Sequence, residues 1–128
     1  ESLGLYGELN NALEDKVDHS RTLMDALQRR VDSVQTTTRL ARHSLTMLEA
    51  AMAAQEGPTQ LCMTHVERRK ARPPREQVRD NVELALEDER ATLAEVQRRL
   101  GDACSRTRVM IGSLETRLQE LRSDLEHK

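Results

Sequence analysis

The chain has 128 residues, with 20 basic and 22 acidic side chains, a net charge of −2 at pH 7 and 37% apolar residues. Tyr6 is its one aromatic residue, so the side chains that dominate most globular cores are missing and a compact, enzyme-like core is excluded. The balanced charge and the lack of aromatic stacking platforms argue against nucleic-acid binding.

Alanine, leucine, glutamate, lysine and arginine together make up half of the chain, a composition typical of coiled coils and long helices. No run approaches the roughly 18 apolar residues of a membrane span. We therefore expect residues 1–128 to form one all-α, elongated, coiled-coil-like helical rod segment.

The first predicted helix spans residues 8–56, where residues three and four apart share one narrow stripe. One amphipathic helix cannot bury its own seam, so a partner helix must cover this stripe, either from this chain or from another. The stripe consists of Asn10, Leu13, Val17, Ser20, Met24, Leu27, Val31, Val34, Thr38, Ala41, Leu45, Leu48 and Met52.

A broken linker is predicted over residues 57–74. Gly57-Pro58 ends the first helix near Glu56, because proline cannot continue the hydrogen-bond ladder and disfavours helical geometry in the residue before it. A short helix at 59–69, with Leu61, Cys62, Val66 and Met63 on its apolar side, would precede a second break at Arg72-Pro73-Pro74.

The second long helix is predicted over residues 75–127, because prolines suit a first helical turn and acidic residues follow them. The step of four from Leu100 to Cys104 is a stutter, which locally unwinds a supercoil. The stripe of this helix consists of Val82, Leu86, Leu93, Val96, Leu100, Cys104, Thr107, Ile111, Leu114, Leu118, Leu121 and Leu125.

The two long helices have similar predicted lengths, about 70 and 80 Å at about 1.5 Å per residue. We therefore expect an antiparallel hairpin joined by the Gly-Pro and Pro-Pro segment, and one end-to-end rod is the alternative. Pairs four residues apart, Glu95 with Arg99 and Asp102 with Arg106, support the exposed face.

The second break carries a motif. Residues 72–80 read Arg-Pro-Pro-Arg-Glu-Gln-Val-Arg-Asp and resemble the tektin signature nonapeptide, Arg-Pro-Asn-Val-Glu-Leu-Cys-Arg-Asp, at five of nine positions. The matching residues are Arg72, Pro73, Glu76, Arg79 and Asp80. Pro74-Arg75 and Gln77-Val78 depart from the signature, so its cysteine is missing. Further similarity covers roughly residues 40–128, including the ending Leu-Arg-Ser-Asp-Leu-Glu-His-Lys.

The resemblance implies a structural, filament-forming protein of ciliary and flagellar axonemes, built into the second half of a longer rod. Its implied partners are other tektin-like chains, tubulin and microtubule inner proteins, and its implied place is the cytoskeleton of the cilium or flagellum. Lateral and end-to-end helix packing would contribute to the architecture and stability of doublet microtubules. The resemblance implies no enzymatic activity, cofactor, membrane or small-molecule substrate.

Three sets of residues are candidate interaction sites. The signature loop is defined by the five matching residues above, and the basic patch would meet an acidic surface through charge-assisted contacts. A solvated linker is the simpler reading of that patch. The basic patch consists of Arg68, Arg69, Lys70, Arg72 and Arg75. The helix-packing seam consists of Leu13, Val17, Met24, Leu27, Val31, Val34, Leu45, Leu48, Leu100, Ile111, Leu114, Leu118, Leu121 and Leu125.

No residue pattern indicates catalysis or metal binding. His19, His43, His65 and His127 are scattered without a second ligand at metal spacing. A carboxylate acid or base needs a pocket that excludes water, which narrow seams do not supply. We expect Cys62 and Cys104 to be reduced and packed, although a disulfide across a hairpin is the alternative.

Two rival classes remain open. A cytoplasmic coiled-coil adaptor would dimerise through the same stripe and present Arg68–Arg75 to an acidic partner. A spectrin-like three-helix module would use the segment at 59–69 as its middle helix, but that segment is too short to cover either long helix.

Overall fold

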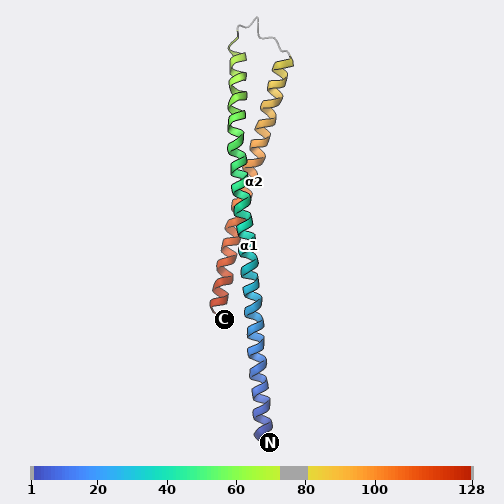
Figure 1. The fold of residues 1–128 in the computed structure, drawn as a ribbon, viewed down its shortest axis with the longest axis vertical. Helices are drawn as coiled ribbons and strands as arrows, with labels where there is room; N and C mark the ends of the chain where they lie inside the picture. The colour runs from blue at the N-terminus through green and yellow to red at the C-terminus, as the bar shows by residue number, and fades with distance from the viewer. Residues whose placement is uncertain (1, 73–80, 128) are drawn as a thin grey trace. The chain divides into compact units, whose positions relative to one another are not determined.

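The computed structural model describes residues 2–72 and 81–127, and it is helical over nearly all of that range. Helix α1 is Ser2–Lys70 and helix α2 is Asn81–Glu126 (Figure 1). The predicted fold class, all-α with two long helices packed on each other, is confirmed. The chain divides into two compact units, one from 1–40 with 111–128 and one from 41–110.

The unit from 41–110 pairs the C-terminal part of α1 with the N-terminal part of α2. Its cross-helix contacts join Glu49 to Arg108, Met52 to Cys104, Thr59 to Gln97 and Cys62 to Leu86. Residue numbers rise along α1 as they fall along α2, so the two helices are antiparallel in this unit, as predicted for a hairpin.

The unit from 1–40 and 111–128 packs α1 beside the C-terminal part of α2 (Figure 1). Its buried side chains are Val31 and Thr38 on α1 and Ile111 and Leu121 on α2. Val31 and Thr38 are seven residues apart, and Ile111 and Leu121 are ten apart, which is one heptad plus three, so each pair lies on one stripe of its helix.

The predicted end of the first helix near Glu56 is wrong. Helix α1 continues through Gly57 and Pro58 to Lys70, so the expected linker from 57 onward and the separate short helix at 59–69 are part of α1. The physical reason is that the packed stripe stays in phase across the proline. Its less exposed residues continue at Gln55, Thr59, Cys62, Val66 and Arg69.

The predicted start of the second long helix at residue 75 lies outside the described residues, as do positions 73–80 as a whole. From Asn81 onward α2 is regular. Of the residues predicted on the apolar side of 59–69, Cys62 is buried and Val66 is half-buried, whereas Leu61 and Met63 are exposed.

The threonine run at 36–38 is helical despite its β-branched side chains. The hydroxyls of Thr36, Thr37 and Thr38 donate to the carbonyls of Asp32, Ser33 and Val34, at 3.0, 3.0 and 2.7 Å. This back-bonding lets Thr38 be buried on the seam, because its hydroxyl finds its acceptor within its own helix.

Candidate interaction surfaces

The seam on α1 is covered from Leu27 onward. Val31 is buried, and Leu27, Val34, Leu45 and Leu48 are half-buried. The covered residues follow alternating steps of three and four from Val31 to Arg69, which is the spacing of a coiled-coil seam.

The seam on α2 is covered from Leu86 to Leu125. Of the six residues predicted for it, Ile111 and Leu121 are buried and Leu100, Leu114, Leu118 and Leu125 are half-buried. Around the stutter at Leu100 and Cys104 the covered face widens to take in Gly101 and Ala103. At a stutter the heptad register of the seam shifts, so a wider part of the helix surface is covered by the partner helix.

The structure places three predicted seam residues in the open. Leu13, Val17 and Met24 on α1 are exposed to 55%, 49% and 40%. They lie in phase with the covered seam but N-terminal to its first covered residue, Leu27.

Two polar positions in the seam were not recognised in the sequence. Gln97 donates from its side-chain amide to the hydroxyl of Thr59 at 3.3 Å, across the two helices. Because a hydrogen-bonded pair removes most of the cost of burying two polar groups, these residues replace an apolar layer beside Pro58. Their positions in the heptad repeat, rather than their polarity, could have identified these two residues as members of the seam.

The basic patch and the signature loop are described only in part. Arg68, Arg69 and Lys70 form the last turn of α1, where cations face the partial negative charge of a helix C-terminus. The Arg72 amide donates to the carbonyl of Arg69 at 3.3 Å, and its side chain is exposed. Pro73, Arg75, Glu76, Arg79 and Asp80 lie outside the described residues.

Both cysteines are free and buried, as expected. The Cys62 thiol contacts the carbonyl of Leu86 at 3.9 Å, and the Cys104 thiol contacts the Met52 sulfur at 3.5 Å. Met52, which contacts Cys104, and Cys62 are ten residues apart on α1, about 15 Å along a helix. A disulfide needs Cα atoms within about 7 Å, so the alternative of a bridge across the hairpin does not fit.

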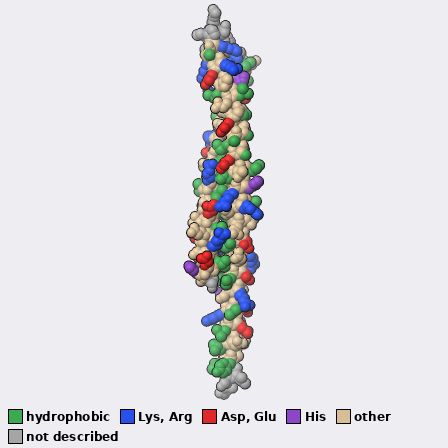
Figure 2. Space-filling view, turned by 60° about the vertical axis from the view of Figure 1, so that its left-hand side comes forward, with side chains coloured by type: hydrophobic (Ala, Val, Ile, Leu, Met, Phe, Trp, Pro, Cys, Tyr) green, Lys and Arg blue, Asp and Glu red, His purple; other side chains and the backbone are tan. Residues whose placement is uncertain are grey.

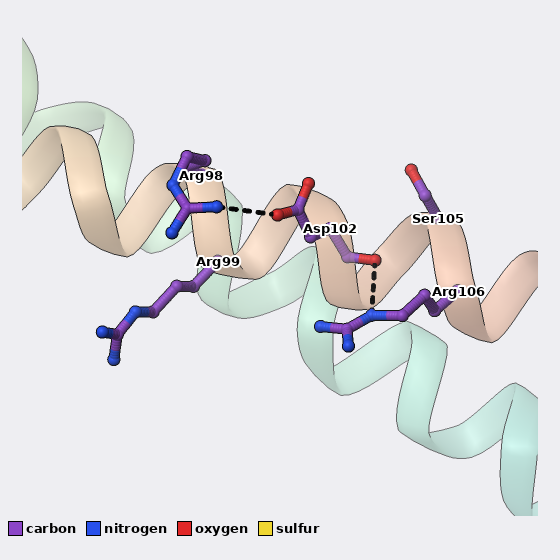
Figure 3. Close-up of a pocket in the computed structure, with 5 residues that line it drawn as sticks. All are labelled: Arg98, Arg99, Asp102, Ser105 and Arg106. Carbon is purple, nitrogen blue, oxygen red and sulfur yellow. Dashed lines mark hydrogen bonds and ion pairs between the residues drawn. The ribbon is translucent and has the colours of Figure 1, made fainter.

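An ionic cluster lies on the outer face of α2, where Arg98, Arg99, Asp102, Ser105 and Arg106 surround an open hollow of about 560 Å³ (Figure 3). Glu95 binds Arg98 at 2.6 Å and Arg99 at 2.9 Å, which confirms the predicted pair of Glu95 and Arg99. The predicted ion pair between the side chains of Asp102 and Arg106 does not form. The Asp102 carboxylate instead binds Arg98 at 3.1 Å, and Arg106 donates to the backbone carbonyl of Asp102 at 3.4 Å.

The arginines change the titration of Glu95. Hydrogen bonds from Arg98 first and Arg99 second lower the pKa of the Glu95 carboxyl from 4.5 to about 2. The same pairing raises the pKa of Arg98. Because Glu95 is 44% exposed and stays ionised, it lacks the enclosure and the near-neutral pKa of a catalytic base.

A second hollow of about 490 Å³ lies beside Cys62 and is mainly apolar, with Met63, Leu93 and Ala94 in its wall. Within the described residues no three metal-binding side chains cluster. No described helix is long and apolar enough to cross a bilayer.

Comparison with known proteins identifies the family. The tektin family model matches residues 6–128. A tektin from Chlamydomonas reinhardtii is 36% identical over 92 residues, which are 72% of this chain and 19% of that protein. The chain thus spans about a fifth of the length of this relative. Because the family match covers both compact units, the chain belongs to the tektin family, the non-enzymatic, helical structural proteins of ciliary and flagellar axonemes.

Proposed function

We propose that this chain is one helical rod segment of an axonemal filament, which packs laterally and end to end with other tektin-like chains and with tubulin and microtubule inner proteins. Family membership carries the proposal, and the long covered seam supports it. The contact area between two such helices grows with their length. A long helix pair with a narrow seam can therefore form a stiff rod without a globular core.

Two surfaces are proposed to meet neighbours in the filament. The basic patch around Arg68–Arg72 suits an acidic protein surface, because guanidinium groups bind carboxylates in a bidentate manner. The signature loop at 72–80 is the second proposed contact, on the strength of its resemblance to the family motif.

Amine crosslinking of extracted axonemes tests the proposal, since the chain has lysines only at positions 16, 70 and 128. We expect the tagged protein to stay with the axoneme after detergent extraction, and Lys70 to crosslink to tubulin or to another tektin. Lys16, which lies 54 residues away on α1, serves as the internal comparison for contacts specific to the basic patch.

Loss of the protein to the detergent-soluble fraction, with crosslinks only to a soluble partner, would support the cytoplasmic adaptor and refute the filament role. Retention combined with crosslinks from Lys16 but none from Lys70 would keep the filament role and refute the contact at the basic patch.

A further inference from the structure

A hydrogen bond between two half-buried polar side chains joins α1 to α2 inside the seam. The Gln97 amide donates to the Thr59 hydroxyl at 3.3 Å, and both residues belong to the unit from 41–110. Thr38, which is also a seam threonine, donates instead to the Val34 carbonyl of its own helix at 2.7 Å. Thr59 and Gln97 thus depend on each other across the seam, whereas Thr38 does not depend on the facing helix.

The apolar residues of the seam fit more than one alignment of the two helices, because they recur every seven residues on both. In the structure Cys104 contacts Met52 and Gln97 contacts Thr59, and both steps between these contacts are seven residues, so one antiparallel alignment accounts for both. A slip by one heptad would set Cys104 against Leu45 in one direction. Apolar side chains would still meet there, so apolar burial alone does not exclude this slip.

The polar pair does distinguish the alignments. After a slip by one heptad the Gln97 amide would face Met52 in one direction and Val66 in the other. Neither of these side chains carries a strong hydrogen-bond acceptor. A covered amide that loses its partner keeps the cost of leaving water without the bond that offsets this cost. Both slipped alignments are therefore penalised relative to the observed one.

Charges at the surface add little to this choice. The ion pair of Glu49 and Arg108 joins the two helices at 3.4 Å, but both side chains are more than half exposed. Such pairs contribute little, because water and salt screen the attraction. Figure 2 shows basic and acidic side chains scattered along the visible surface, so charges of both signs would also be neighbours after a slip.

We propose that Thr59 and Gln97 select the alignment in which α1 and α2 pair, at a cost in stability. A polar residue at one core position of a coiled coil fixes register in this way. The alignment matters for any assembly of the chain, because it decides which side chains of the two helices lie together on the outer surface, as Glu49 and Arg108 do. The inference goes beyond the filament role and concerns the hairpin itself.

Disulfide trapping with the native Cys104 thiol tests the alignment, in the complete protein carrying Cys62→Ala so that one native thiol remains. M52C should bridge to Cys104 under oxidation, because the Met52 sulfur lies 3.5 Å from the Cys104 sulfur. L45C reports the slipped alignment. Position 45 lies one heptad, about 10 Å along α1, from position 52, which exceeds the Cα separation of about 7 Å that a disulfide tolerates.

Replacing the polar pair by apolar side chains, T59V/Q97L, should release the alignment. We expect L45C to stay unbridged beside Thr59 and Gln97, and to form an intrachain bridge in T59V/Q97L, with a matching fall in the bridging of M52C. T59C/Q97L reports the slip in the opposite direction, since Cys104 would then face position 59. Circular dichroism checks that each variant is helical, and mass spectrometry separates bridges within a chain from bridges between chains.

Two single variants are the matched controls. T59S keeps the hydroxyl, and T46V removes an exposed threonine whose hydroxyl donates to the Arg42 carbonyl within α1. Both should retain M52C bridging and leave L45C unbridged. Full M52C bridging in T59V/Q97L, with no bridge from L45C or in T59C/Q97L, would overturn the proposal, because the alignment would then be fixed without the polar pair. A bridge from L45C in the chain that retains Thr59 and Gln97 would also overturn it.

Thermal unfolding gives an independent readout. T59V alone leaves the Gln97 amide without its acceptor, so its Tm should fall below that of the parent chain and below that of T59V/Q97L, which removes both polar groups. T46V should leave the Tm close to that of the parent. Equal Tm values for T59V and T59V/Q97L would mean that the Gln97 amide does not depend on Thr59, which would contradict the proposed selection.

Discussion

Glu95 lies on the open face of α2, where water screens most electrostatic interactions. An exposed ion pair contributes little to stability, because the side chains lose freedom and salt weakens the attraction. Two arginines on one carboxylate nevertheless bias its proton equilibrium strongly, since both donate hydrogen bonds that favour the ionised form. The pKa of Glu95 is therefore a sensitive reporter of this side-chain arrangement.

We expect the change Arg98→Gln to raise the pKa of Glu95 from about 2 toward its ordinary value of 4.5, because Arg98 is the largest cause of the shift. Since the folded state lowers this pKa, the stabilisation is complete above pH 4.5 and is lost as the pH falls from 4.5 toward 2. Carbon NMR of the side-chain carboxyl group across this range measures the pKa directly. The change Arg117→Gln, far from Glu95 along α2, is the control and should leave the pKa of Glu95 unchanged.

The sequence predicted only part of this arrangement. Spacing allowed Asp102 to pair with Arg98 or with Arg106, because both lie four residues away on the same helix. Glu95 and Asp102 share Arg98 in the structure, which leaves Arg106 to a backbone carbonyl. Competition among three arginines for two carboxylates is decided by rotamers, and spacing alone does not encode them.

At the scale of elements, Pro58 shows that packing overrides a local stop signal. Its ring removes the hydrogen bond that residue 58 would donate to the carbonyl of Ala54, which costs about 3 kcal/mol relative to alanine. The covered residues on both sides, Met52 and Cys62, touch α2 and hold the two halves of α1 in one stripe.

Replacing Pro58 with alanine should therefore stabilise the fold, by up to about 3 kcal/mol, through the restored hydrogen bond and the better helix propensity. Thermal unfolding followed by circular dichroism measures the change as a higher Tm. The control is Gly57→Ala, which adds a methyl group into open space and should gain only about 1 kcal/mol. A lower Tm for Pro58→Ala would mean that the packing requires a kink here.

The heptad phase predicted most of both helices, because covered residues from Leu27 to Met52 and from Leu86 to Leu125 follow it. The predicted stripe ends at Met52 because Gly57-Pro58 indicates the end of the helix, and the next seam positions, Gln55 and Thr59, are polar. What it lacked was the partner: the hydroxyl of Thr59 receives a hydrogen bond from Gln97, 38 residues further along the chain. Such a pairing appears only once the two helices are aligned.

At the scale of the whole molecule, the family was predictable and the contacts of its motif were not. A nonapeptide resemblance at five of nine positions agrees with a family match over residues 6–128. Four of the five matching residues, Pro73, Glu76, Arg79 and Asp80, lie outside the described part of the chain, so their role stays a prediction.

The two thiols report on whether the pairing of α1 and α2 is intact. Cys62 and Cys104 are 2% and 1% exposed, so both should react far more slowly with a maleimide in the folded protein than in urea. Mass spectrometry after timed labelling measures each site separately. Under oxidation we expect no intrachain bridge between them, and a bridged peptide would contradict the alignment of Met52 with Cys104.

Among the residues that the structure describes, the five least exposed side chains are small or medium-sized: those of Cys104, Cys62, Val31, Thr38 and Ala41. Two packed helices leave most large side chains partly exposed, and the larger buried side chains, Ile111 and Leu121, are each 8% exposed. Added volume at these positions would force the helices apart, whereas removed volume elsewhere leaves a gap that water can reach. Natural variation should therefore be constrained most at the smallest buried residues. Replacement of a buried alanine or cysteine by leucine should be rarer than replacement of a seam leucine by alanine or cysteine.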